Sequence, residues 1–480
     1  MRVPAVCLVL LTVCGLSTAV PADPPRGSTV ARLDEVLQAY ADRGRFQGSV
    51  LVATDGKVVY RKGFGPANVE SGIPNTPETR HRIAWLASAF TAAIILQLAD
   101  EGRLDPDETI AKYLPAYRND YARQITLHHL LGHTSGIPDQ PREWALEHYR
   151  AEYSLDDLVK QANLGVLKFK PGTLYRHSTN GYNLLAAIIA RETGKPFEQV
   201  LRDRILLPAG MRDTGLVRDD MSPENHASGY NQLLWGLLEA APEMNESYAV
   251  GAGGMYSTVE DLYRWDRALD GDELLSQASR ARMFAPGVDG VGYGWRIGSY
   301  TGADDRPNTL IWATGDTSGA AAVMVRLVED RHLIVLLGNI RQVPLAEMVT
   351  SLTNVLVGRP DKPITPPVKP LYEVLVEKGL DAAIERFVGS PDLPTENLVN
   401  RLGYELMGRD RINTAIRVFQ FNVAAHPQAW NTYDSLAEGY MEAGDHLTAV
   451  EFYNRSLQLN PGNRNGRLML RRLSVQPGPF

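Results

Sequence analysis

The chain has 480 residues and a formal net charge of −7 at pH 7, with 44% hydrophobic and 22% charged residues. This length favours two or more domains, and the composition is ordinary for a globular protein. A small negative charge, without any run rich in lysine and arginine, argues against a nucleic-acid-binding function.

The first 22 residues have the features of a secretory signal peptide. Arg2 precedes an apolar run over residues 6–16, and small residues surround a plausible cleavage site after Ala22 or after Ala19. The apolar run is too short to span a bilayer, so we expect no transmembrane segment in the mature chain. We therefore expect residues 1–22 to be removed and the protein to be exported, as a periplasmic or secreted protein.

The pattern of apolar residues predicts a first domain that mixes strands and helices. Residues 29–43 have the spacing of an amphipathic helix, and residues 84–101 form a second helical pattern. Asp55 and Gly56 form a hairpin signal between two apolar segments. The predicted strands are 46–53, 57–60, 320–325 and 333–337. Because strands stand at both ends of a helical middle, we expect residues 23–357 to be an α+β domain whose antiparallel sheet is assembled from both termini.

The C-terminal part of the chain predicts a linker and a helical repeat. Residues 358–370 contain five prolines and are expected to form an extended linker. Beyond it, matched residues recur at an offset of 34, the period of a tetratricopeptide helix–turn–helix. The matched pairs are Leu402 and Leu436, Met407 and Met441, Ala415 and Ala449, Phe419 and Tyr453, and Pro427 and Pro461. We expect residues 371–480 to be a small all-α tetratricopeptide-like domain, in which either a helix pair at about 371–389 supplies a third layer or the array docks on the first domain.

Short motifs stand in a fixed order along residues 30–357. They are 48–53 (GSVLVA), 101–105 (EGRLD), 130–136 (LLGHTSG), 171–173 (PGT), 210–215 (GMRDTG) and 252–258 (AGGMYST). In this order they resemble the serine β-lactamase-related family, which includes class C β-lactamases, D-alanyl-D-alanine carboxypeptidases and esterases. The resemblance implies a β-lactamase and penicillin-binding-protein-like α+β fold and a small acyl or peptide-like ligand. We expect no cofactor and no metal site, because no Glu follows His129 as it does in zinc proteases.

The resemblance also implies where the chemistry of such a hydrolase stands. In the family a serine attacks an acyl carbonyl, and a lysine one helical turn later and a tyrosine of a Tyr-x-Asn loop move its proton. A strand carrying Lys/His-Thr-Gly holds the substrate carboxylate and the oxyanion. In the order serine, lysine, tyrosine, asparagine and basic residue, these positions hold Trp85, Ser88, His177, Thr179 and Ala313. The last motif keeps only Thr314 and Gly315.

The five replacements predict a catalytically silent protein with a hydrolase fold. An indole at Trp85 has no nucleophilic oxygen, and loss of the nucleophile alone costs several orders of magnitude in rate. We expect Trp85 to fill the space of the acyl group and to bury roughly 150–250 Å² against the walls of the pocket. The pocket, with Trp85, Thr314 and Gly315 in its wall, is then closed or binds a ligand without turnover.

Two other functions remain open on the sequence alone. Ser88 and His177 could form a rewired nucleophile–base dyad of an esterase, amidase or peptidase, with Asp316 orienting the imidazole. Alternatively, the first domain is a platform, and residues 371–480 bind a protein partner.

Overall fold

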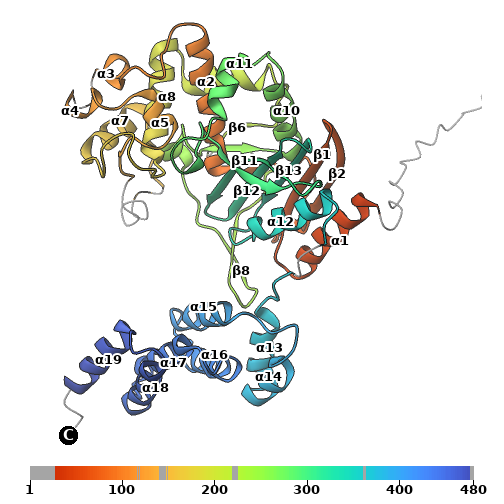
Figure 1. Ribbon diagram of the computed structural model, residues 1–480, viewed down its shortest axis with the longest axis vertical. Coiled ribbons are helices and arrows are strands. Elements are labelled where there is room, and N and C mark those ends of the chain that lie inside the picture. Colours follow the sequence, from red (N-terminus) through yellow and green to blue (C-terminus); the bar gives the residue numbers. More distant parts are fainter. Residues whose placement is uncertain are drawn as a thin grey trace, which may run out of the picture.

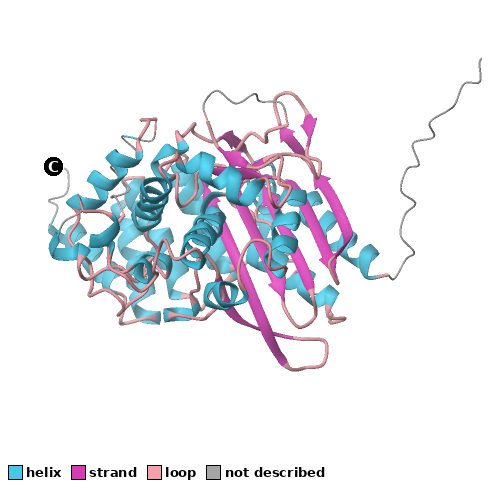
Figure 2. Cartoon of the chain, turned by 90° about the horizontal axis from the view of Figure 1, so that it is seen from above, coloured by secondary structure: helices cyan, strands magenta, loops and turns pink. Residues whose placement is uncertain are grey.

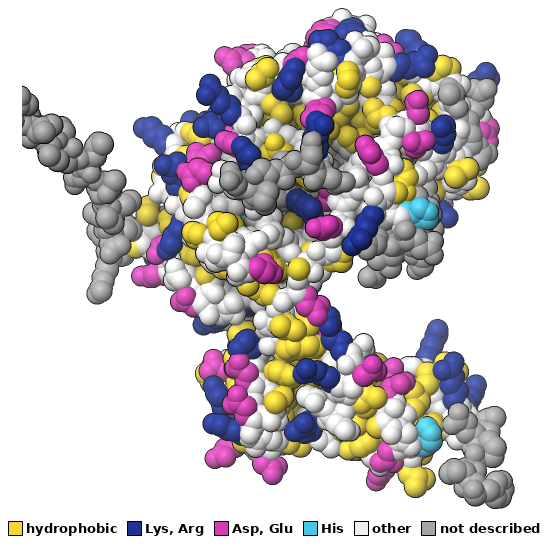
Figure 3. Space-filling view, turned by 180° about the vertical axis from the view of Figure 1, so that it is seen from behind, with side chains coloured by type: hydrophobic (Ala, Val, Ile, Leu, Met, Phe, Trp, Pro, Cys, Tyr) yellow, Lys and Arg dark blue, Asp and Glu magenta, His cyan; other side chains and the backbone are white. Residues whose placement is uncertain are grey.

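The computed structural model describes residues 28–475 apart from 116, 118, 140–147, 149, 219–224 and 361–363. The expected signal peptide at 1–22 lies outside the described residues. Within them, no helix is both long enough and apolar enough to cross a membrane. The chain folds into two lobes joined at a narrow waist, and the charges of both signs are interspersed on the face that Figure 3 shows.

A six-stranded antiparallel sheet forms the centre of the first lobe (Figure 1), in the order β10-β11-β12-β13-β1-β2. Its strands are β1 (Gly48–Thr54), β2 (Lys57–Phe64), β10 (Arg296–Thr301), β11 (Pro307–Thr317), β12 (Ala320–Leu327) and β13 (His332–Gly338). The N-terminal hairpin joins the C-terminal strands where β1 pairs with β13, with Val50 opposite Leu336. The prediction of an α+β domain with a sheet from both termini is therefore confirmed.

Alternation of side chains along the strands gives the sheet an apolar surface on each face. Val50 and Val52 pack on one side, and Leu51 and Ala53 on the other. Helices α1 (Thr29–Asp42) and α12 (Leu345–Leu356) cover the first face, and α10 (Val259–Asp270) lies against the second. Figure 2 shows the strands side by side with the helices around them.

The helical middle of the chain packs beside the second face. Its central helix, α2 (Ser88–Asp100), is buried along nearly its whole length, and α8 (Thr179–Thr193) packs against it. The other helices are α3 (Ile110–Tyr113), α4 (Asn119–Ala122), α5 (Leu127–Leu131), α7 (Leu155–Leu164), α9 (Phe197–Leu201) and α11 (Gln277–Met283). Short 3₁₀ or π turns are η1 (Ala84–Ala87), η2 (Arg202–Leu206), η3 (Glu246–Ala249) and η4 (Val288–Gly290). Short strands are β3 (Pro66–Asn68), β4 (Ile73–Pro74), β5 (His81–Arg82), β6 (Gly215–Leu216), β7 (Tyr230–Gln232), β8 (Leu238–Ala240) and β9 (Met255–Ser257).

The second lobe consists of antiparallel helices. They are α13 (Lys369–Glu377), α14 (Leu380–Phe387), α15 (Glu396–Met407), α16 (Ile412–Ala425), α17 (Trp430–Glu442), α18 (His446–Leu459) and α19 (Arg464–Val475). The starts of α15 and α17, and those of α16 and α18, recur at the same 34-residue offset as the matched residues. The expected extra helix pair at about 371–389 is present as α13 and α14.

The β7–β8 hairpin of the first lobe docks into the second lobe (Figure 1). Leu233 and Trp235 at its tip are buried in the same apolar cluster as residues of α13, α15 and α16. The Trp235 indole stacks on Tyr372 with ring centroids 5.9 Å apart. Arg409 of the second lobe donates two hydrogen bonds of 2.7 Å to Glu239 on β8. The C-terminal helical lobe therefore docks on the first domain and also contains the extra helix pair α13 and α14.

We expect Trp235→Ala to loosen the attachment of the second lobe, because it leaves a cavity where the indole contacts Tyr372. Limited proteolysis should cut the linker about tenfold faster in this variant than in the wild-type protein. Leu237→Ala is the matched control, since Leu237 lies on the same hairpin but is 51% exposed. Equal cleavage rates in all three proteins would show that the hairpin does not hold the lobes together.

Candidate functional site

The segment that leads into α2 is held by close backbone contacts from two glycines. A Cβ at Gly315 on β11 would collide with the carbonyl oxygen of Ile83, and a Cβ at Gly253 would touch the Trp85 indole. Ala84 between them has a positive φ of 43°, which is rare for a residue with a side chain. Residues 84–87 form a 3₁₀ turn, so the predicted helix over 84–101 begins as η1 and continues as α2.

Trp85 lies at the mouth of the pocket and not inside it. Its side chain is 41% exposed, so the expectation that it fills and closes the acyl site is wrong. The 3₁₀ turn directs the indole along the edge of the pocket, where its ring meets the His177 ring with centroids 4.6 Å apart. Trp85 therefore forms one wall of an open pocket.

His177 lies between two other aromatic rings. Its ring centroid is 4.6 Å from that of Trp85 on one side and 4.6 Å from that of His133 on the other. His133 in turn lies 4.7 Å from Tyr182. The four rings form a continuous row from the mouth of the pocket into the core.

His133 is neutral at physiological pH. Its burial holds the pKa of the imidazole well below the usual value, and the nearby His177 and Arg296 lower this pKa further. The backbone N–H of Ser178 donates to Nδ1 of His133 at 3.1 Å, so the ring hydrogen resides on Nε2. His133 belongs to the 130–136 motif, and nothing in the local sequence pattern marks it as a residue that lines the pocket.

The Ser88 hydroxyl is bonded to a backbone carbonyl and not to a base. The side chain is almost fully buried, and its hydroxyl donates to the carbonyl oxygen of Ala252 at 3.1 Å. Thr91, one turn later, makes the same kind of bond to Gly251 at 2.7 Å. Ser88 and His177 do line one pocket, but no hydrogen bond joins them in the described part of the chain.

The carboxylate beside His177 comes from Asp139. Its Oδ2 lies 3.9 Å from Nδ1 of His177, and its Oδ1 accepts a 3.0 Å hydrogen bond from the backbone of Asn180. Burial raises the pKa of the Asp139 carboxyl, but His177 and the backbone N–H groups at the start of α8 outweigh this and leave the pKa below its usual value. Asp316, which we expected to orient the imidazole, instead pairs with Arg341 at 3.0 Å.

The pocket has a volume of about 200 Å³ and brings together five of the residues singled out from the sequence. These are Trp85, Ser88, His177, Ala313 and Thr314. Gly315 packs beneath η1, and Thr179 is the first residue of α8, just behind the Ser178 cap. The lining residues that sequence analysis missed include His133, Tyr175, Trp295, Arg296 and Trp312. In the sequence, Tyr175 lies close to His177 and Trp312 lies next to Ala313. This proximity to the motif residues is the only sequence feature that could have indicated that they line the pocket.

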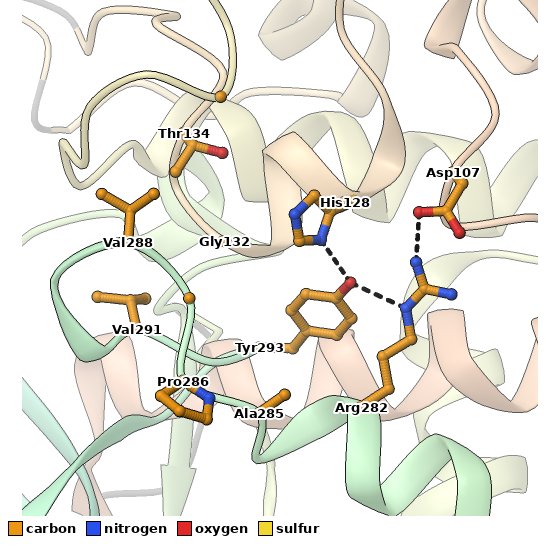
Figure 4. Close-up of a pocket in the computed structure, with 12 residues that line it drawn as sticks. Asp107, His128, Gly132, Thr134, Arg282, Ala285, Pro286, Val288, Val291 and Tyr293 are labelled. Atoms are coloured by element: carbon orange, nitrogen blue, oxygen red, sulfur yellow. Dashed lines mark hydrogen bonds and ion pairs between the residues drawn. The ribbon is translucent and has the colours of Figure 1, made fainter.

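A second cavity of about 230 Å³ adjoins this pocket and shares Val291 with it. Figure 4 shows that its polar groups bond to one another: Arg282 donates to the Tyr293 hydroxyl at 3.1 Å, and that hydroxyl lies 2.7 Å from Nδ1 of His128. Arg282 also pairs with Asp107. This network fixes Tyr293, and thereby the strand start that carries Trp295 and Arg296 into the wall of the first pocket.

Comparisons with known proteins agree with this geometry. The putative penicillin-binding protein PbpX of Bacillus subtilis (strain 168) is 32% identical over 303 residues, covering 62% of this chain and 74% of the relative. Penicillin-binding protein 4* of the same organism is 28% identical over 414 residues, covering 79% of this chain and 88% of the relative. The structure of D-amino acid amidase from Ochrobactrum anthropi SV3 complexed with L-phenylalanine superposes with a TM-score of 0.60 at 26% identity, covering 69% of this chain and 98% of the amidase. The Beta-lactamase family model matches residues 33–352, well over half of the chain, and the chain therefore belongs to the Beta-lactamase family.

Proposed function

We propose that this protein is an exported, catalytically silent member of its family that binds a small acyl- or peptide-like ligand without turning it over. The observation that carries the proposal is the contact between the Trp85 and His177 rings, at the positions that the resemblance assigns to the nucleophile and to the tyrosine that moves its proton. Neither ring has an oxygen that can attack a carbonyl.

The hydroxyl of Ser88 is poorly placed to replace the lost nucleophile. A serine hydroxyl becomes a good nucleophile only when a neighbouring base takes its proton. The Ser88 hydroxyl donates its hydrogen to the carbonyl oxygen of Ala252, which is not a base. We therefore expect any hydrolysis in this pocket to remain near the background rate.

The pocket itself suits a small ligand with an apolar or aromatic group. Its walls carry the rings of Trp85, Tyr175, Trp295 and Trp312, which offer flat apolar surface for stacking. The cavity is smaller than the ~300–1,000 Å³ typical of pockets for drug-sized molecules. The amidase relative, whose structure holds L-phenylalanine, supports a ligand of about the size of one amino acid.

An activated ester of N-acetylphenylalanine tests binding and turnover in the same sample. We expect a saturable change in tryptophan fluorescence, while the ester is released at the rate measured without protein. Protein-dependent hydrolysis that disappears in both Ser88→Ala and His177→Phe would contradict the proposal and establish the rewired dyad. Ser299→Ala is the matched control for the serine variant, because Ser299 is exposed on β10.

We also propose that the second lobe is a tetratricopeptide-like array. The 34-residue recurrence of its helix starts and the small buried Ala415 and Ala449, where paired helices approach, support this assignment. Binding of a protein partner by residues 371–480 stays a prediction.

A further inference from the structure

A third cavity lies where the two lobes meet, beside the β7–β8 hairpin that reaches the second lobe (Figure 1). Its volume is about 660 Å³, more than three times that of the pocket at Trp85 and His177 and within the ~300–1,000 Å³ typical of ligand pockets. The two cavities share no lining residue. The walls of this cavity, which we call the interlobe groove, come from within residues 41–47, 65–66, 232–238, 340–344, 367–369 and 398–401.

The interlobe groove is basic, although the chain as a whole has a net charge of −7. One carboxylate, that of Asp42, lines the groove, against the four cations Arg43, Arg45, Lys369 and Arg401. Arg45 and Lys369 each pair with a glutamate that does not line the groove. Arg43 and Arg401 are exposed, and neither forms an ion pair with a carboxylate among the residues that the structure describes. Two positive charges in the groove are therefore available to an anionic ligand.

The charge of Arg401 is only partly compensated by its own helix. Glu405, one turn further along α15, accepts a 2.8 Å hydrogen bond from the backbone N–H of Leu234 and does not line the groove. Burial raises the pKa of the Glu405 carboxyl, and the positive charges of Arg401 and Arg409 offset this rise only in part. Arg401 therefore interacts with Glu405 over more than ion-pair distance, and its guanidinium keeps its hydrogen-bond donors for another acceptor.

The groove also has apolar walls that are open to solvent. Its partly exposed apolar side chains come from the hairpin, from the segments before α12 and α13, and from α15: Leu234, Leu238, Pro344, Pro367 and Leu398. Covering apolar surface gains about 25 cal/mol per Å². A ligand that fits this groove therefore carries apolar groups as well as negative charge.

Gln47 adds a hydrogen-bond donor that has no acceptor. Its side chain belongs to the lining, the residue is 6% exposed, and its Nε2 makes no hydrogen bond within the described part of the chain. Buried donors are nearly always paired, because an unpaired one costs free energy. A ligand with carbonyl oxygens that reached Gln47 would supply the missing acceptor.

We propose that the interlobe groove binds an extended segment of a partner protein that carries both acidic and apolar side chains. Carboxylates of this segment bind the guanidinium groups of Arg43 and Arg401, and its apolar side chains cover the leucines of the groove. A peptide fits the groove better than a phosphate polymer, because it brings apolar groups and carbonyl oxygens together with the negative charge. The proposal goes beyond the binding of a small ligand in the first lobe, and the site needs residues of both lobes.

Fluorescence anisotropy of labelled octapeptides with the full chain tests this proposal. The acidic probe alternates glutamate and leucine, and the reference peptide has glutamine in place of each glutamate. We expect the wild-type protein to bind the acidic probe about tenfold more tightly than the reference peptide. Arg43→Gln and Arg401→Gln should each weaken binding of the acidic probe about threefold, and the double variant should bind the two peptides within about twofold of each other.

Arg386→Gln is the matched control, since Arg386 is exposed on α14 and does not line the groove. It should keep the full preference for the acidic probe. Because Arg43 and Arg401 are exposed, their variants should unfold at the wild-type temperature, so that a lost preference is not caused by misfolding.

Three outcomes would overturn the proposal. The first is equal affinity of the wild-type protein for the two peptides, or no binding of either peptide at millimolar concentration. The second is a preference for the acidic probe that survives in the double variant. The third is binding of a polyphosphate chain, or of an octapeptide of glutamate alone, as tight as that of the acidic probe at the same ionic strength, which would show that the groove binds any polyanion.

Discussion

Restoring three lost side chains in one chain, as Trp85→Ser, Ser88→Lys and His177→Tyr, is expected to produce a protein that forms a covalent adduct with a penicillin or an activated ester. The scaffold around these positions is retained, because Gly315 on β11 lies against the turn that leads into α2 and Thr314 lines the pocket. A serine with a lysine one helical turn later again has a base within reach. Acylation should be on the order of 10³-fold faster than in a variant that lacks the base.

The matched control for this experiment carries Trp85→Ser and His177→Tyr together with Ser88→Met. Methionine resembles lysine in length but cannot accept a proton, so the control separates restored chemistry from a mere enlargement of the pocket. Intact mass and peptide mapping after timed incubation measure the adduct. If the restored chain folds, binds the ligand and still remains unlabelled, then the scaffold has lost more than its reactive side chains.

Replacement of the buried carboxylate of Glu246, on η3, is expected to stabilise the protein at alkaline pH. Glu246 on η3 has a side chain that is only 3% exposed, and among the residues that the structure describes its ion-pair partner is Arg82, at 3.8 Å. Burial raises the pKa of Glu246 from 4.5 to about 7, although Arg82 lowers it in part. Between these two pH values the unfolded chain loses a proton that the folded chain retains, so the free energy of unfolding falls as the pH rises.

Above pH 7 this shift corresponds to about 3 kcal/mol of lost stability. Glu246→Gln should therefore be about 3 kcal/mol more stable than the wild-type protein at pH 8, and the two should be nearly equal near pH 4.5. Urea denaturation across this range measures the difference, with the exposed Glu243→Gln as the control. If the free energies of unfolding of the wild-type protein and of Glu246→Gln instead change in parallel between pH 4.5 and pH 8, Glu246 is ionised in the folded protein over this range.

Much of the fold could be predicted because its determinants are local in the sequence. Asp55 and Gly56 both adopt a positive φ, as the hairpin signal requires, and the strands on either side of them pair as expected. The continuous apolar run of β1 predicts a strand that is buried on both faces, as the structure shows. The helix boundaries of the second lobe follow from a period that can be read by comparing the sequence with itself.

The orientation of side chains at the site could not be predicted in this way. The direction of Trp85 depends on the contact between Ile83 and Gly315, which are far apart in the chain, and on the strained backbone at Ala84. The carboxylate near His177 is Asp139, which approaches from a loop whose path no local pattern specifies.

The docking of the β7–β8 hairpin could not be predicted either, because it depends on contacts between residues that are far apart in the chain. Trp235 stands in a region of Gly and Pro loops, and its partners lie more than 130 residues later in the chain. A short segment with two buried apolar residues has no distinctive period. Only the assembled structure shows that this hairpin joins the two lobes.

The most direct test is the intact mass of the wild-type protein after separate incubations with a penicillin and with a fluorophosphonate probe. A silent pocket predicts an unchanged mass with both reagents, at concentrations at which the restored variant is fully labelled. A stoichiometric adduct that maps to Ser88, and is absent from Ser88→Ala, would contradict the account and show that this serine is an active nucleophile.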